Sequence, residues 1–107
     1  MKSIEWAAGL FEGEGCLSKV KDRPNYSLKL TMTDLDVVQD FADIFGLPVC
    51  GPYYKGKYKP VYQVNLKSMS KVYKIVEQML PYLGTRRSYK ALNCLDEIDN
   101  HNYTKGN

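Results

Sequence analysis

One segment decides how this 107-residue chain is interpreted: Ala7-Ala8-Gly9-Leu10-Phe11-Glu12-Gly13-Glu14-Gly15. It overlaps a predicted helix over Lys2–Glu12, in which apolar residues recur at helical spacing. Glycine inside a helix is unfavourable, because each one costs about 1 kcal/mol relative to alanine. The small residues Ala8, Gly9 and Gly13 leave one side of the helix nearly bare, so a second helix backbone can approach it closely.

The sequence contains one helix of this kind, so the simplest partner is the same helix of a second copy. Glu12 and Glu14 are two residues apart and point in different directions, which disfavours an acid/base pair within one chain. Across a two-fold axis, the two copies of Glu14 would meet just past the helix ends. Their repulsion would be relieved by divalent cations, which suggests phosphodiester hydrolysis. The alternative is that both glutamates are solvated acids around a glycine-rich helix end.

The rest of the chain predicts an α+β domain with the order αββαββαα. We expect four short antiparallel strands in one sheet, with helices on one face and the other face open. The second strand has the clearest period of two, because leucines and a methionine alternate with Ser27, Lys29 and Thr31. The predicted strands are Cys16–Asp22, Tyr26–Thr33, Val49–Tyr54 and Val61–Leu66, and the further helices are Asp34–Phe45, Ser70–Leu80 and Thr85–Ile98.

The charges are segregated, although the formal net charge is only +3. The predicted second helix carries only acids: Asp34, Asp36, Asp40 and Asp43. A basic, polar sheet face fits a DNA or RNA surface, since lysine attracts phosphate and neutral polar groups can contact base edges. Alternatively, lysines on exposed strands only prevent aggregation. In the predicted strands and their turns, by contrast, Asp22 is the only acid. The basic residues there are Lys19, Lys21, Arg23, Lys29, Lys55, Lys57, Lys59 and Lys67.

Composition excludes several classes of protein. With 44% apolar residues the chain is not a disordered tail, and no stretch approaches the length of a membrane span or a signal sequence. Three widely spaced cysteines without a CxxC pair argue against a disulfide scaffold and for a reducing compartment. We expect one domain over residues 1–100, a polar tail over 101–107, and no membrane partner.

The quoted segment resembles the nonamer that names the LAGLIDADG homing endonucleases. Ala8, Gly9, Leu10 and Gly15 match directly, and Glu12 and Glu14 stand where the family has acids. Ala7 replaces a leucine, and Glu14 replaces the commoner aspartate. The resemblance extends over residues 2 to about 100, because αββαββα is the half-fold of the family, with a saddle-shaped sheet.

The resemblance implies roles for particular residues. Glu14 would bind a catalytic Mg²⁺ or another divalent cation such as Mn²⁺, helped by the carbonyl of Gly13. Arg86, where the family often has lysine, matches the basic residue that stabilises phosphate charge, and Arg87 is the next candidate. Asp34 matches the polar residue that positions water. A single motif implies a homodimer on a nearly palindromic DNA site, with Ala8, Gly9, Glu12 and Gly13 at the interface.

Strand phase predicts which side chains face DNA. The first strand is ambiguous, since Lys19 and Lys21 have suitable chemistry but the opposite phase would present Ser18 and Val20. The full set of predicted DNA-facing residues is Lys19, Lys21, Ser27, Lys29, Thr31, Tyr53, Lys55, Lys57, Gln63, Asn65 and Lys67.

Three hypotheses remain open from the sequence. The first is a metal-dependent, site-specific DNA endonuclease encoded in a mobile element, intron or phage genome, acting in a bacterial or phage-infected cytoplasm or an organelle matrix. The second is a non-catalytic nucleic-acid binder on the same fold, either a regulator or an intron maturase that binds RNA. The third is a small structural dimer whose lysines only keep it soluble.

Overall fold

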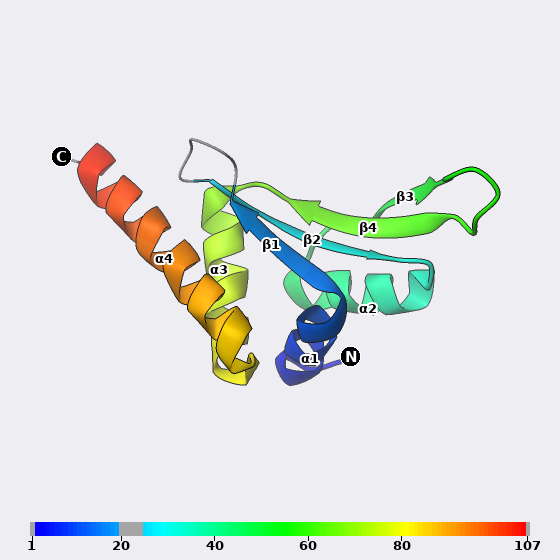
Figure 1. The fold of residues 1–107 in the computed structure, drawn as a ribbon, viewed down its shortest axis with the longest axis horizontal. Helices are drawn as coiled ribbons and strands as arrows, with labels where there is room; N and C mark the ends of the chain where they lie inside the picture. The colour runs from blue at the N-terminus through cyan, green and yellow to red at the C-terminus, as the bar shows by residue number, and fades with distance from the viewer. Residues whose placement is uncertain (1, 20–24, 107) are drawn as a thin grey trace.

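The structure is a computed structural model that describes residues 2–19 and 25–106. Within these ranges, helices and strands follow one another in the predicted αββαββαα order (Figure 1). None of the helices in this part of the chain is both long and apolar enough to cross a membrane. The elements are α1 (Ile4–Glu14), β1 (Gly15–Lys19), β2 (Tyr26–Met32), α2 (Leu35–Phe45), β3 (Cys50–Tyr53), β4 (Val61–Leu66), α3 (Met69–Met79), a 3₁₀ turn η1 (Leu80–Tyr82) and α4 (Thr85–Gly106).

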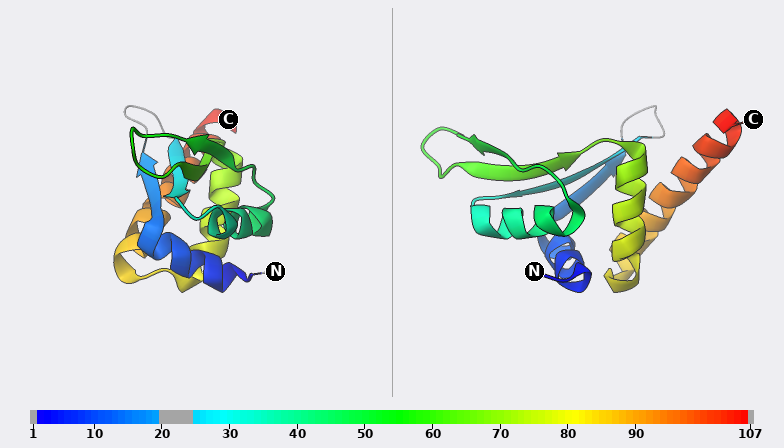
Figure 2. Two further views of the ribbon diagram at one scale, coloured as in Figure 1. Left: turned by 90° about the vertical axis from the view of Figure 1, so that its right-hand side faces the viewer. Right: turned by 180° about the vertical axis from the view of Figure 1, so that it is seen from behind.

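The four strands form one antiparallel sheet in the order β1-β2-β4-β3. β2 and β4 lie in the centre, with Lys29 opposite Asn65 and Thr31 opposite Gln63. The helices lie on one side of the sheet, and the other side is open (Figures 1 and 2). The predicted α+β fold with one covered sheet face is therefore confirmed.

The core lies between the sheet and the helices. On β2, Leu28 and Leu30 are fully buried while Lys29 between them is exposed, as the period of two predicts. Phe11 of α1 stacks on Phe41 of α2 with ring centroids 6.4 Å apart, which joins two helices beneath the sheet. α3 and α4 complete this layer with buried Val72, Ile75, Val76, Met79, Ala91, Cys94, Leu95 and Ile98.

Two helix ends differ from the sequence prediction. α1 continues through Gly13 to Glu14, because the chain turns into β1 at Gly15, where the Gly15 N–H donates to the Phe11 carbonyl. α4 continues to Gly106, past the expected end at Ile98, so residues 101–106 are helical rather than a separate tail. The apolar stripe ends at Ile98, but no proline follows it and the next glycine is Gly106, so nothing breaks the helix earlier.

Alkaline pH should weaken the contact between α4 and the sheet. Burial raises the pKa of the Cys94 thiol from 9.0 to about 12, and burial together with a hydrogen bond to Glu97 raises the pKa of Tyr26 from 10.0 to about 12. Both groups are therefore neutral in the fold at a pH where the unfolded chain has already lost those protons. Stability is complete below pH 9 and falls as the pH rises toward 12.

Urea unfolding between pH 8 and pH 11.5 measures this loss, which we expect to be about 1 kcal/mol or more. The double variant Tyr26→Phe/Cys94→Ala, less stable at pH 8, should lose less stability over the same range. Equal losses in the two proteins would contradict the assignment of the effect to these groups.

Candidate nucleic-acid interface and active site

The open face of the sheet is polar along its two central strands. Ser27, Lys29 and Thr31 point to this side of β2, since the alternate residues of the strand are packed against the helices. On β4, Gln63 and Asn65 lie directly opposite Thr31 and Lys29 and share their face. The Thr31 hydroxyl donates to Oε1 of Gln63 at 3.4 Å. The predicted phase of both strands is therefore the observed one.

The first strand, whose phase the sequence left open, presents Ser18 rather than Lys19 on the open face. Leu17 is buried, and Lys19, two residues on, lies on the helix-covered side, where its Nζ is 2.9 Å from Oε2 of Glu97. The Tyr26 hydroxyl, opposite Lys19, donates to Oε1 of the same glutamate, whose pKa is held below its usual value first by Lys19. Lys19 is thus a wrong prediction for the open face.

Cys16 and Ser18 occupy the open side of β1 instead, with Cys16 opposite Lys29 and Ser18 opposite Ser27. Apolar and polar residues alternate only weakly in this short strand, so its phase could not be assigned from the sequence. The predicted Lys21 lies outside the described residues.

The β3–β4 hairpin extends this face away from the helices (Figures 1 and 2). Tyr53 pairs with Val61, which shares the face of Gln63, so Tyr53 belongs to the open side. Lys55 and Lys57 are exposed in the hairpin turn, and Lys67 is exposed just past β4. Tyr53 thus has the predicted phase, and the three lysines are exposed, which their predicted role as DNA-facing residues requires.

Glu14 is the last residue of α1 and is exposed, as is Gly13 before it. The next residue, Gly15, is the first residue of the edge strand β1 and pairs with Leu30 of β2. Glu14 therefore lies where α1 leads into the sheet. A Cβ on Gly15 would overlap the Phe11 ring, and only glycine therefore allows this turn from helix to strand. Around Glu14, the described residues form no cluster of three or more acids, cysteines or histidines.

Glu12 has partners at the start of α4. Its Oε1 accepts a hydrogen bond from the Gly84 N–H, and its Oε2 lies 3.0 Å from Nε of Arg87. The same Nε donates to the Glu12 backbone carbonyl at 2.9 Å, and the guanidinium lies 5.5 Å from the Phe11 ring centroid. Arg87 is therefore bound within the chain, whereas its neighbour Arg86 is exposed.

A groove of about 530 Å³ brings Arg86 to the neighbourhood of Glu14. It lies between β1 and the first turns of α4, and Gly15, the residue after Glu14, lines it together with Arg86. Arg87 also lines the groove, as do three polar residues of α4 that were missed from the sequence, Tyr89, Lys90 and Asn93. Their spacing along one helix side is the signal that could have identified them: Arg86, Tyr89, Lys90 and Asn93.

Asp34 follows β2 and stands at the N-cap position of α2, but its side chain makes no capping bond. Its backbone carbonyl accepts from the N–H groups of Val37 and Val38, both at 3.1 Å. The carboxylate is thus exposed at the end of the strand that pairs with β1. This position agrees with the sequence prediction, while a contact with Glu14 is not observed.

The exposed surface of small residues on α1 contains fewer of the predicted interface residues than the sequence suggests. Gly9 and Gly13 are exposed, and a Cβ at either position would meet nothing within 4 Å. Ala8 is fully buried in the core of its own chain, and Glu12 forms an ion pair with Arg87. Of the predicted interface residues, Gly9 and Gly13 remain as an open small-residue surface, one turn apart.

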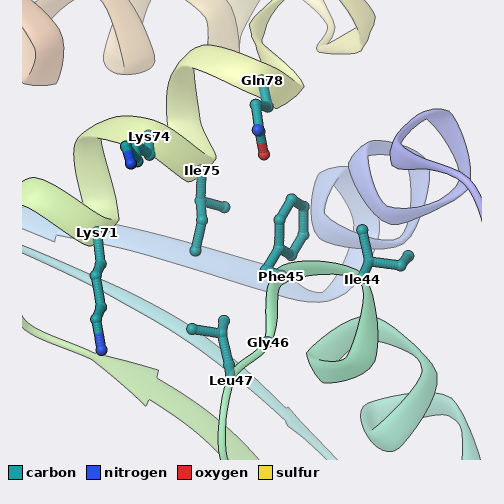
Figure 3. Close-up of a pocket in the computed structure, with 8 residues that line it drawn as sticks. All are labelled: Ile44, Phe45, Gly46, Leu47, Lys71, Lys74, Ile75 and Gln78. Atoms are coloured by element: carbon teal, nitrogen blue, oxygen red, sulfur yellow. The ribbon is translucent and has the colours of Figure 1, made fainter.

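Another hollow, of about 240 Å³, lies between the end of α2 and α3 (Figure 3). Its wall is formed by apolar Phe45, Leu47 and Ile75, with Lys71 and Lys74 at its rim. None of the candidate residues for DNA or metal binding lines it.

No protein-family model matches the chain, and no curated protein matches it by sequence. Solved structures do match. The homing endonuclease I-CvuI, crystallised with its DNA target and Ca, matches with a TM-score of 0.70 and 19% identity over 95% of this chain and 69% of that one. The chain has the LAGLIDADG homing endonuclease fold. A mutant of I-SmaMI matches with a TM-score of 0.73 and 14% identity, over 96% of this chain and 39% of that one.

This chain matches only part of each of these solved proteins. The homing endonuclease I-TnaI has a TM-score of 0.60 and 18% identity, with 84% of this chain and 67% of that chain covered. This chain thus spans about two thirds of I-CvuI and I-TnaI and less than half of I-SmaMI. The expected resemblance of the nonamer is therefore accompanied by the fold that the family uses.

Proposed function

We propose that this protein is a site-specific double-strand DNA endonuclease of the homing type, acting as a homodimer on a nearly palindromic site with Mg²⁺ or another divalent cation. The observation that carries the proposal is the groove between β1 and α4. It joins Arg86 to the end of α1 that bears Glu14, beside a polar and basic open sheet. An acid and a base thus lie beside a surface suited to a polyanion.

Under this proposal the open sheet binds DNA. Lys29 in the centre of the sheet, Lys55 and Lys57 in the hairpin turn and Lys67 past β4 would attract phosphates, and each contact releases counterions. Ser27, Thr31, Gln63 and Asn65 would contact base edges or backbone, because their neutral donors and acceptors suit groove recognition. The bond between Thr31 and Gln63 orients that amide before DNA arrives.

The exposed end of α1 suits a divalent cation. The Glu14 carboxylate and the Gly13 carbonyl are oxygen donors of the kind that Mg²⁺ prefers, and Mg²⁺ usually retains several waters as well. One carboxylate per chain is a partial set, so a second copy and the DNA phosphates would supply further oxygens. A bound cation would polarise the phosphate and supply a nucleophile at neutral pH.

Other residues of the chain would stabilise negative charge on the phosphate, contact the DNA and orient water. Arg86 would offer planar, permanently charged donors to the developing phosphate charge. Tyr89, Lys90 and Asn93 would contact the DNA strand that enters the groove. Asp34 would orient water from the end of β2 through its free carboxylate.

Neighbouring structures support binding to DNA. I-CvuI was crystallised with its target in the presence of Ca, and I-Vdi141I, an archaeal intron-encoded homing endonuclease, was also complexed with DNA. A second I-CvuI structure, at 21% identity, holds uncleaved DNA in the presence of Mg. These facts concern those proteins and make duplex DNA the first substrate to test here.

A non-catalytic DNA-binding regulator or RNA-binding maturase is the second candidate. Arg86 favours it, because arginine keeps its proton and cannot donate one to a leaving group as lysine can. Two assays separate the candidates. Retention of nucleic acid on a filter in EDTA, with a steep dependence on salt, is expected from both: of pooled DNA duplexes by the endonuclease or a regulator, and of RNA by a maturase. New DNA ends that require Mg²⁺ are expected from the endonuclease only, and salt-independent retention would contradict both.

Two lysines on opposite faces of the sheet test the interface. Lys29→Gln should weaken DNA binding several-fold and reduce the slope of log K against log salt by about 1, as expected for one lost phosphate contact. Lys19→Gln should leave affinity and slope unchanged, since Lys19 pairs with Glu97 behind the sheet. Fluorescence anisotropy at several salt concentrations gives both quantities, and equal effects of the two variants would refute the assigned face.

A further inference from the structure

The contact between Glu12 and the start of α4 joins the two places that carry the candidate chemistry. Glu12 lies in the last turn of α1, two residues before Glu14. Its partners are Gly84, which precedes α4, and Arg87 in the first turn of that helix. Arg86 lies between these partners in the sequence, so Glu14 and Arg86 are each within two residues of this contact.

The contact restrains both position and rotation. The Glu12 carboxylate accepts from a backbone N–H at the positive end of α4, where a negative charge is favoured. Arg87 binds the carboxylate at 3.0 Å and the Glu12 carbonyl at 2.9 Å, which ties its side chain to the backbone of α1. Phe11 lies beneath the guanidinium and is itself packed on Phe41. The end of α1 and the start of α4 are therefore joined by a hydrogen bond, an ion pair and a cation–π contact.

Because Arg87 is bound to Glu12, the two neighbouring arginines have different environments. Both arginines line the groove, but only 20% of the Arg87 side chain is accessible and its Nε is used within the chain, whereas Arg86 is exposed. We propose that Glu12, acting through Arg87, is a positioning residue that sets Arg86 at its working distance from Glu14. This inference rests on the endonuclease proposed above and adds a residue whose role is distinct from metal binding.

The main test is Glu12→Gln in the full-length protein. Glutamine keeps an oxygen that can accept from the Gly84 N–H but loses the charge that holds Arg87. Single-turnover cleavage should fall about 10- to 100-fold, because small misplacements of catalytic groups have effects of this order. The dissociation constant for the same duplex in Ca²⁺ should change by less than about two-fold, because the sheet face is untouched.

The chain offers a matched control at Glu97. This glutamate also forms an ion pair that fixes α4, at 2.9 Å, and 35% of its side chain is accessible compared with 37% for Glu12. Glu97→Gln removes the same charge far from Glu14 and should leave cleavage unchanged. A second variant, Gly84→Ala, keeps every charge but puts a Cβ 2.8 Å from Oε1 of Glu12, so the carboxylate must move and cleavage should again fall.

A double-mutant comparison identifies the residue through which Glu12 acts. In an Arg86→Ala background, Glu12→Gln should cause almost no further loss, because there is no guanidinium left to position. Circular dichroism must show that each variant is folded at the assay temperature.

Each outcome bears on a different claim. If the wild type cuts and Glu12→Gln behaves like Glu97→Gln, the positioning role is wrong while the endonuclease stands. If Glu12→Gln loses binding and cleavage together, or its effect is undiminished without Arg86, the residue is merely structural and the inference fails. If the wild type does not cut any duplex, the proposed function itself fails, and the positioning role falls with it.

Discussion

Replacing Glu14 with glutamine is expected to abolish DNA cleavage and to leave DNA binding intact. The substitution preserves the size of the side chain but removes the negative charge that would hold the cation. A metal that polarises phosphate is worth several kcal/mol in the transition state, so the cleavage rate should fall by about 10³-fold or more. Glu14 is exposed at the end of α1, and its loss should not disturb the core.

Cleavage of a fixed duplex in Mg²⁺ and binding of the same duplex in Ca²⁺ measure the two effects separately. Glu77→Gln is a suitable control, because Glu77 is an exposed glutamate on α3, a different helix. Wild-type cleavage by Glu14→Gln would show that the metal site has been assigned to the wrong residue.

Replacing Gly9 with glutamate is expected to produce a folded monomer that no longer makes double-strand breaks. A side chain at Gly9 meets no atom of its own chain within 4 Å, so the isolated subunit tolerates it. In a dimer that packs α1 against its symmetry mate, the side chain would occupy the space of the second helix and bring two like charges together.

Sedimentation equilibrium should give a mass near twice 12.3 kDa for the wild type and near 12.3 kDa for the variant. Gly9→Ala, which adds only a methyl group, should have an intermediate effect on dimer affinity. A wild-type monomer, or a dimer that survives Gly9→Glu unchanged, would contradict the proposed interface.

The regular parts of the fold were predictable because each depends on local sequence. β2 alternates strictly between apolar and polar residues, so its phase, and that of β4 opposite it, could be assigned. α2 ends at Phe45, and Gly46 after it adopts a left-handed conformation with φ of 66°, as expected for a glycine after a helix. β1 has only five residues and includes Gly15 and Cys16, which favour neither face strongly.

The parts that escaped prediction depend on contacts between distant residues. The position of Lys19 is settled by Glu97, which also binds Tyr26 from a helix near the other end of the chain. Arg87 could not be separated from Arg86 by sequence, because only the turn before α4 decides which of them meets Glu12. The spacing of the groove residues puts them on one side of α4, but only the fold shows that this side lies beside β1.

The most direct measurement is sequencing of the ends produced from a pool of randomised DNA duplexes in Mg²⁺, with wild type and Glu14→Gln in parallel. We expect the ends made by the wild type to cluster at one nearly palindromic sequence, and we expect no ends from the variant. This result would also show the symmetry of the dimer and identify the target. Duplexes that are retained by the protein but never cut, under any divalent cation tested, would contradict the endonuclease.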